Sequence, residues 1–115
     1  MSEPNKLVVV WINGDKEVAV RMAFMYTLNS KLKEWWKEVS LIVWGPSAKL
    51  LADDKSLQEY IVKIKDAGVE LFACKACADS YGVSDALETM GINVKYTGQV
   101  LTDFLKDENT KVITV

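Results

Sequence analysis

Short apolar runs alternate with helical patterns along the whole chain, and this alternation limits the possible folds more than any other feature. Strand-sized segments occupy residues 7–12, 41–44, 69–73, 93–96 and 111–115. Helical spacing, or a glycine that ends a helix, marks each intervening segment. Continuous apolar strands separated by helices are typical of a parallel sheet that is covered on both faces. The sequence therefore predicts an α/β fold with three layers, α/β/α, around a five-stranded, mostly parallel sheet.

The helical patterns between these runs can be placed individually. Between residue 16 and about residue 37, apolar residues recur every three or four positions, at Val18, Met22, Met25, Leu28, Leu32 and Trp35. This spacing predicts one amphipathic helix whose apolar stripe packs on the sheet, with Asp15 as its N-cap. Further helices are expected around residues 57–64, 83–90 and 99–106, and Gly68 and Gly91 are placed to end two of them.

Composition restricts the classes of function. The 115 residues fit one compact domain, residues 1–115, and 14 Lys+Arg against 16 Asp+Glu leave no basic excess for binding nucleic acid. The chain has no histidine, which excludes Ser-His-Asp and Cys-His catalysis and any His-containing metal site. No apolar run approaches the roughly 20 residues of a membrane span, and residues 1–6 carry no apolar signal segment. We therefore expect a cytoplasmic protein with no membrane or nucleic-acid partner.

Two cysteines follow the third predicted strand, in the segment Cys74-Lys75-Ala76-Cys77. A thiol at this point meets unpaired backbone N–H groups and the positive end of a helix dipole, which both favour thiolate. Lys75 adds a nearby positive charge, and Cys77 lies one helical turn further on, so the two sulfurs can face each other. Cys74 is thus a candidate reactive thiol with Cys77 beside it. The alternative is that both cysteines are small buried packing residues.

Parallel sheets place their working loops at the carboxyl ends of the strands, here residues 13–16, 45–49, 74–79 and 97–98. Asn13 is expected to form a turn and a pocket wall, and Gly45 to let the second strand turn into a helix that begins at Pro46. Asp79 is close enough to Cys74 to carry a proton, with a solvated helix face as the alternative. Tyr81 and Tyr96 have the same two interpretations.

Other chemistry for the cysteine pair is disfavoured. A thioredoxin-like site is expected after the first strand and with a later cis-proline, whereas Pro4 and Pro46 both precede this pair. Two thiolates supply only half of a closed tetrahedral zinc site. We therefore expect neither a metal nor an organic cofactor.

The order of several segments resembles the DsrE-like proteins of sulfur relay and sulfur oxidation. The similar segments are residues 45–51, residues 67–70, Cys74 with Gly82-Val83 eight residues later, residues 91–94 and residues 111–115. The resemblance implies that Cys74 accepts a sulfane sulfur as a persulfide and passes it on, between donor and acceptor proteins. It also implies a homo-oligomer, a trimer or a hexamer. Cys77 departs from the sulfur-relay pattern, which needs one cysteine here.

Three functions remain open at this point. A sulfur carrier needs Cys74 alone, a thiol–disulfide redox sensor needs both Cys74 and Cys77, and an oligomeric scaffold needs neither. Trp35 and Trp36 are adjacent on the predicted helix and point about 100° apart, so one of them is a candidate for a subunit interface.

Overall fold

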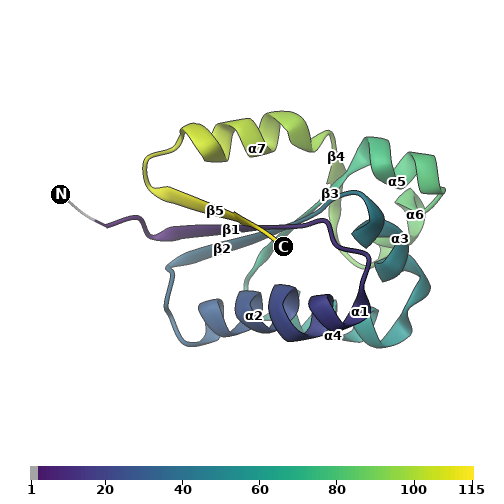
Figure 1. Cartoon of the computed structure of the whole chain (residues 1–115), viewed down its shortest axis with the longest axis horizontal. Coiled ribbons are helices and arrows are strands. Elements are labelled where there is room, and N and C mark those ends of the chain that lie inside the picture. The colour runs from purple at the N-terminus through teal and green to yellow at the C-terminus, as the bar shows by residue number, and fades with distance from the viewer. Residues whose placement is uncertain (1–2) are drawn as a thin grey trace.

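A sheet of five parallel strands forms the centre of the computed structural model, which describes residues 3–115 (Figure 1). The strands are β1 (Lys6–Trp11), β2 (Glu38–Val43), β3 (Glu70–Cys74), β4 (Asn93–Lys95) and β5 (Thr110–Thr114). Their order across the sheet is β4-β3-β2-β1-β5, and every neighbouring pair is parallel. The predicted α/β fold is confirmed, with a sheet that is parallel throughout.

Helices cover both faces of this sheet, as the three-layer prediction requires. They are α1 (Lys16–Val18), the π-helical η1 (Ala19–Phe24), α2 (Met25–Leu32), α3 (Pro46–Asp53), α4 (Lys55–Asp66), α5 (Lys75–Tyr81), α6 (Ser84–Thr89) and α7 (Thr97–Lys106). Figure 1 shows α7 on one face and α1, α2 and α4 on the other. Over residues 3–115, no helix has both the length and the apolar character needed to cross a bilayer.

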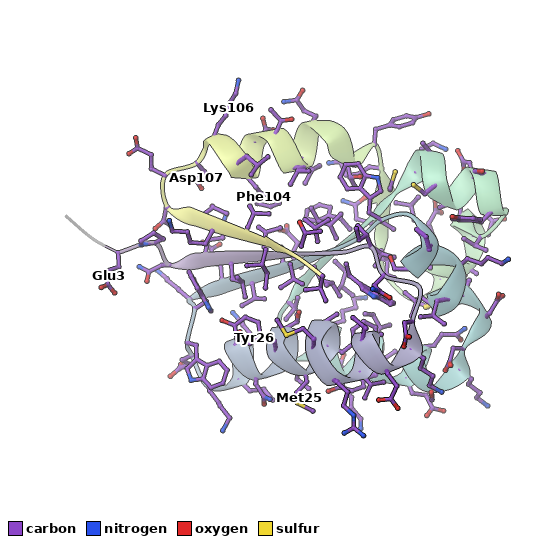
Figure 2. All side chains as sticks on the ribbon, in the orientation of Figure 1. Glu3, Met25, Tyr26, Phe104, Lys106 and Asp107 are labelled. Atoms are coloured by element: carbon purple, nitrogen blue, oxygen red, sulfur yellow. The ribbon has the colours of Figure 1, made fainter. Side chains whose placement is uncertain are left out.

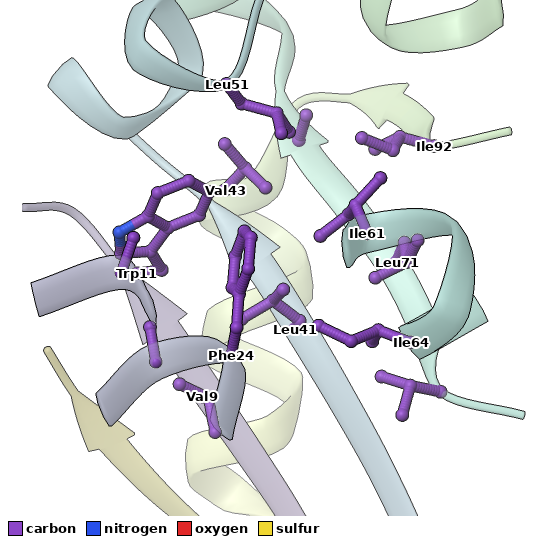
Figure 3. Packing of buried hydrophobic residues seen from close by; sticks show 14 of the residues in the cluster. Val9, Trp11, Phe24, Leu41, Val43, Leu51, Ile61, Ile64, Leu71 and Ile92 are labelled. Carbon is purple, nitrogen blue, oxygen red and sulfur yellow. The ribbon is translucent and has the colours of Figure 1, made fainter. Parts of the chain in front are cut away.

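The larger apolar core lies between the sheet and the helices η1, α2 and α4, and it also includes buried residues of α3, α5 and α6. Its centre is Phe24, whose ring meets Trp11 edge-on at a centroid distance of 4.8 Å and Tyr60 at 5.2 Å (Figure 3). Leu41 of β2 and Ile61 of α4 are fully buried beside them. This core fixes the sheet and leaves the carboxyl ends of the strands free to carry other side chains.

The first helix differs from its prediction in both its length and its buried face. It ends at Leu32, because the chain turns at Glu34, which has a φ of +56°. Trp35 and Trp36 therefore lie in the turn before β2 and not on the helix. Met22, Met25, Leu32 and Trp35, expected in the buried stripe, are exposed instead.

The residues of this helix that face the sheet are mostly small. The buried positions are Ala19, Ala23, Phe24, Thr27 and Ser30. Alanines four residues apart lie on one face of a helix and let its backbone approach the sheet closely. The π-helical segment contains an extra residue per turn, so the side chains that follow it are rotated relative to a regular helix. A strict helical period therefore selected the wrong face.

Caps and glycines at the other helices agree with the sequence. The Asp15 side chain accepts a hydrogen bond from the Glu17 N–H at 2.8 Å, as predicted for an N-cap. Gly68 and Gly91, which follow α4 and α6, have φ values of +100° and +85°. This left-handed conformation strains other residues, so a glycine suits both positions.

The opposite face of the sheet carries a smaller apolar cluster beneath α7. Val8, Val10, Ile42 and Phe72 are its buried members. Phe104 points from α7 toward the sheet, and its ring lies 6.3 Å from that of Phe72 (Figure 2). Because side chains alternate between the faces of a strand, Cys74 lies on the same face as Phe72, under the start of α7.

Candidate functional site

The two cysteines lie where β3 ends and α5 begins. Cys74 is the last residue of β3 and the N-cap of α5, and Cys77 lies in the first turn of that helix. Cys74 is only 5 % exposed, whereas Cys77 is half-buried. The sequence thus predicted the position of Cys74 correctly, but its burial could not be seen in the spacing.

The environment of Cys74 favours its thiolate. Burial raises the pKa of the Cys74 thiol, but the backbone N–H and the thiol of Cys77, the Thr97 side chain and the Ala76 N–H all lower it, and the net pKa is below the ordinary value. Cys74 makes no capping hydrogen bond of regular geometry, so these N–H groups act on its sulfur mainly as partial positive charges. Polar groups at the start of α5 therefore outweigh the effect of burial.

The environment of Cys77 favours the opposite protonation state. Burial raises the pKa of the Cys77 thiol, and the neighbouring Cys74 sulfur raises it further through a hydrogen bond and its charge. The Gly45 backbone N–H faces Cys77 and partly offsets this effect. Gly45, predicted only as a turn at the end of β2, is thereby placed beside the second thiol. The pair divides into one thiol that ionises easily and one that holds its proton.

Lys75 and Asp79 interact with each other. The Lys75 Nζ lies 2.8 Å from Asp79 Oδ2, and the Ser84 hydroxyl also donates to Asp79. These two contacts lower the pKa of Asp79, and the Asp79 carboxylate raises the pKa of Lys75. Lys75 also lies 5.9 Å from the centre of the Tyr96 ring. Asp79 is therefore an ionised partner of Lys75, which argues against its use as a proton carrier.

Asn13 holds the turn after β1. Its backbone N–H donates to the Val115 carbonyl at 3.3 Å, and its side chain accepts from the Asp15 N–H at 2.8 Å. Within residues 3–115, no hydrogen bond or ion pair joins Asn13 to either cysteine. Tyr81, at the end of α5, is exposed, and so is Tyr96.

Thr97 is a site residue for which the sequence analysis predicted no role. It is the first residue of α7, is 1 % exposed, and its side chain faces the Cys74 sulfur. The register of the sheet explains this placement, because Cys74 pairs with Lys95 on β4 and Thr97 follows two residues later. Its position in a loop at the carboxyl edge was visible in the sequence, but its burial was not.

Comparison with known proteins agrees with this fold. The model of the DsrE/DsrF-like family matches residues 6–115, so the chain belongs to the DsrE/DsrF-like family. No protein with a curated description matches the chain.

Two solved structures are similar over nearly their whole length. One is a conserved protein of unknown function, BT1422 from Bacteroides thetaiotaomicron, which is 36 % identical. The match covers 96 % of this chain and 95 % of that chain, with a TM-score of 0.91. The other is the YchN protein from E. coli, which is 15 % identical. The match covers 96 % of this chain and 99 % of that chain, with a TM-score of 0.74. The second likeness concerns the fold alone.

Proposed function

We propose that the protein is a sulfur carrier that holds a sulfane sulfur on Cys74 as a persulfide. The observation that carries the proposal is the placement of Cys74 at the end of β3 and the start of α5, where its pKa is lowered while that of the neighbouring Cys77 is raised. The thiolate is the form of cysteine that attacks a sulfur–sulfur bond. Membership of the DsrE/DsrF-like family supports the same chemistry, since its sulfur-relay members use a cysteine after the third strand.

The transfer reaction balances without a cofactor. The Cys74 thiolate attacks the outer sulfur of a donor persulfide, a new sulfur–sulfur bond forms on Cys74, and the donor leaves as a thiolate. An acceptor thiolate then attacks the outer sulfur of the Cys74 persulfide, and Cys74 leaves as a thiolate. Each step exchanges one sulfur–sulfur bond for another, so no external oxidant or reductant is consumed.

A second candidate function uses Cys77 as well. The Cys74 and Cys77 thiols are neighbours at the start of α5, which favours attack of a Cys77 thiolate on the inner sulfur of a Cys74 persulfide. That step forms a Cys74–Cys77 disulfide and releases hydrosulfide, so the two cysteine sulfurs are oxidised and the transferred sulfur is reduced. The raised pKa of Cys77 slows this step at neutral pH, which favours the carrier.

Intact mass spectrometry after treatment with polysulfide separates the two candidates. A carrier gains about 32 Da, one sulfur atom, in the wild type and equally in Cys77→Ser. A thiol–disulfide pair instead loses about 2 Da, and this loss disappears in Cys77→Ser. A wild-type mass that does not change under these conditions would contradict both functions and favour a scaffold.

We also propose that the protein is cytoplasmic and acts as a homo-oligomer, and exposed apolar side chains of η1, of α2 and of the turn after α2 support the oligomer. Met22 and Leu32 are exposed, and Trp35, which is 55 % exposed, contacts Tyr26 at a ring distance of 6.0 Å. Trp36 is the weaker interface candidate, because its indole N–H donates to the Tyr26 hydroxyl within the same subunit.

Trp35→Ala is therefore expected to reduce the assembly to smaller species, with Trp36→Ala as the comparison variant. Analytical ultracentrifugation at several protein concentrations measures the change. An unchanged sedimentation profile for both variants would remove the tryptophans from the interface.

A further inference from the structure

The Thr97 side chain is a buried polar group without an ordinary partner. Its Oγ1 is fully shielded, and it makes no hydrogen bond of regular geometry within the described part of the chain. Leaving a buried hydroxyl unpaired destabilises the folded state, so each such group calls for an explanation. Thr102, five residues further along the same helix, shows the usual arrangement, because its hydroxyl donates to the Gly98 carbonyl at 2.8 Å.

The position of Cys74 beside Thr97 explains why this hydroxyl is left unpaired. Cys74 and Lys95 are paired on adjacent strands, and the chain passes from Lys95 through Tyr96 into α7, which brings Thr97 over the face of β3 that carries Cys74. Neutral sulfur is a weak hydrogen-bond acceptor, whereas a thiolate carries a full charge, and hydrogen bonds to charged groups are stronger. A hydroxyl that is unpaired beside a thiol therefore gains its partner when that thiol ionises.

We propose that Thr97 is a positioning residue that donates a hydrogen bond to the Cys74 thiolate and so sets how much of Cys74 is ionised at neutral pH. The inference deepens the proposed function and rests on Cys74 being its working thiol. The direction of the effect agrees with the geometry, because the Thr97 side chain lowers the pKa of Cys74. The helix α7 thus contributes to a site otherwise built from β3 and α5.

Other ionisable groups around Cys74 must be held constant in the test. These are Cys77, Lys75 and Asp79 on α5, Lys95 on β4 and Tyr96 before α7, together with Glu88 on α6, which acts on Lys75. A Cys77→Ser background removes the second thiol, and the other groups are identical in all variants compared. Any difference between the variants then arises from residue 97 alone.

The experiment is a pH titration of the thiolate absorbance in the ultraviolet, taken as the difference from the matching Cys74→Ser protein. Thr97→Val keeps the shape and removes the hydroxyl, so the thiolate fraction at pH 7 is expected to fall roughly threefold to tenfold. The titration midpoint then moves to higher pH, while Thr97→Ser restores it and Thr102→Val leaves it unchanged. Thr97→Ala supplies a second variant that cannot clash, with the same expected direction.

A midpoint that does not rise in Thr97→Val or Thr97→Ala would overturn the inference, as would a Thr97→Ser protein that behaves like Thr97→Val. The titration uses no sulfur donor, so it is independent of the polysulfide experiment. A shifted midpoint in a protein that takes up no sulfur would retain the role of Thr97 and reject the carrier. Sulfur uptake with an unshifted midpoint would retain the carrier and reject the role of Thr97.

Discussion

Cys74→Ser is expected to abolish sulfur uptake entirely. A serine hydroxyl is not ionised at neutral pH and does not attack a persulfide, whereas the Cys74 thiolate is favoured by the polar groups at the start of α5. The measurement is the mass gain of about 32 Da, one sulfur atom, after polysulfide treatment, mapped to residues by digestion. Serine is close in size to cysteine, so the fold of the variant should be retained.

The matched control is Cys77→Ser, which removes the neighbouring thiol from the same helix. It should retain the mass gain, because Cys77 holds its proton more tightly than Cys74. A mass gain that persists in Cys74→Ser and disappears in Cys77→Ser would transfer the reactive role to Cys77. It would also show that exposure outweighs thiolate character in this pair.

Phe24→Ala should be the most destabilising of the predicted substitutions, by about 3–5 kcal/mol in the free energy of unfolding. Phe24 is fully buried and meets both Trp11 and Tyr60 edge-on, so its removal leaves a cavity between η1 and the sheet and breaks two aromatic contacts. Urea denaturation followed by fluorescence or circular dichroism measures the change.

Met25→Ala, at the adjacent residue, is the control for this prediction. Met25 is exposed on the outer side of the helix, so its loss should change the free energy by no more than about 0.5 kcal/mol. Equal losses in the two variants would contradict the buried face described for this helix. They would instead support the face that regular helical spacing selects.

The sequence was sufficient for the order of the elements along the chain and for a parallel sheet, but not for the order of the strands across that sheet. Runs such as residues 7–12 and 41–44 are continuous and apolar because β1 and β2 are covered on both faces. The buried face of the first helix was harder to predict, because a π-helical segment and two small residues, Ala19 and Ala23, determine it. A spacing rule weights large apolar side chains and therefore selected Met22 and Met25.

At the site, too, features set by local sequence could be predicted, whereas features set by the three-dimensional arrangement could not. The position of Cys74 follows from local chemistry, since the end of a buried strand and the start of a helix are both visible in the sequence. Thr97, which acts on Cys74, and Gly45, which acts on Cys77, are far from these thiols in sequence and near them only through the strand order. Lys75 was correctly placed near the site, but its pairing with Asp79 depends on side-chain conformations that spacing does not specify.

The unequal cover of the two sheet faces has a consequence for local opening. One face is closed by α1, η1, α2 and α4, whereas α7 alone lies over Phe72, and Thr97 is its one buried residue (Figure 1). Elements with few buried contacts open more often than the rest of a protein, and amide hydrogen exchange reports that opening. The amides of α7 should exchange earlier than those of α4, which buries Leu57, Ile61 and Ile64. Because Cys74 lies on this face and is only 5 % exposed, we expect a bulky donor to reach its sulfur more readily when α7 opens locally.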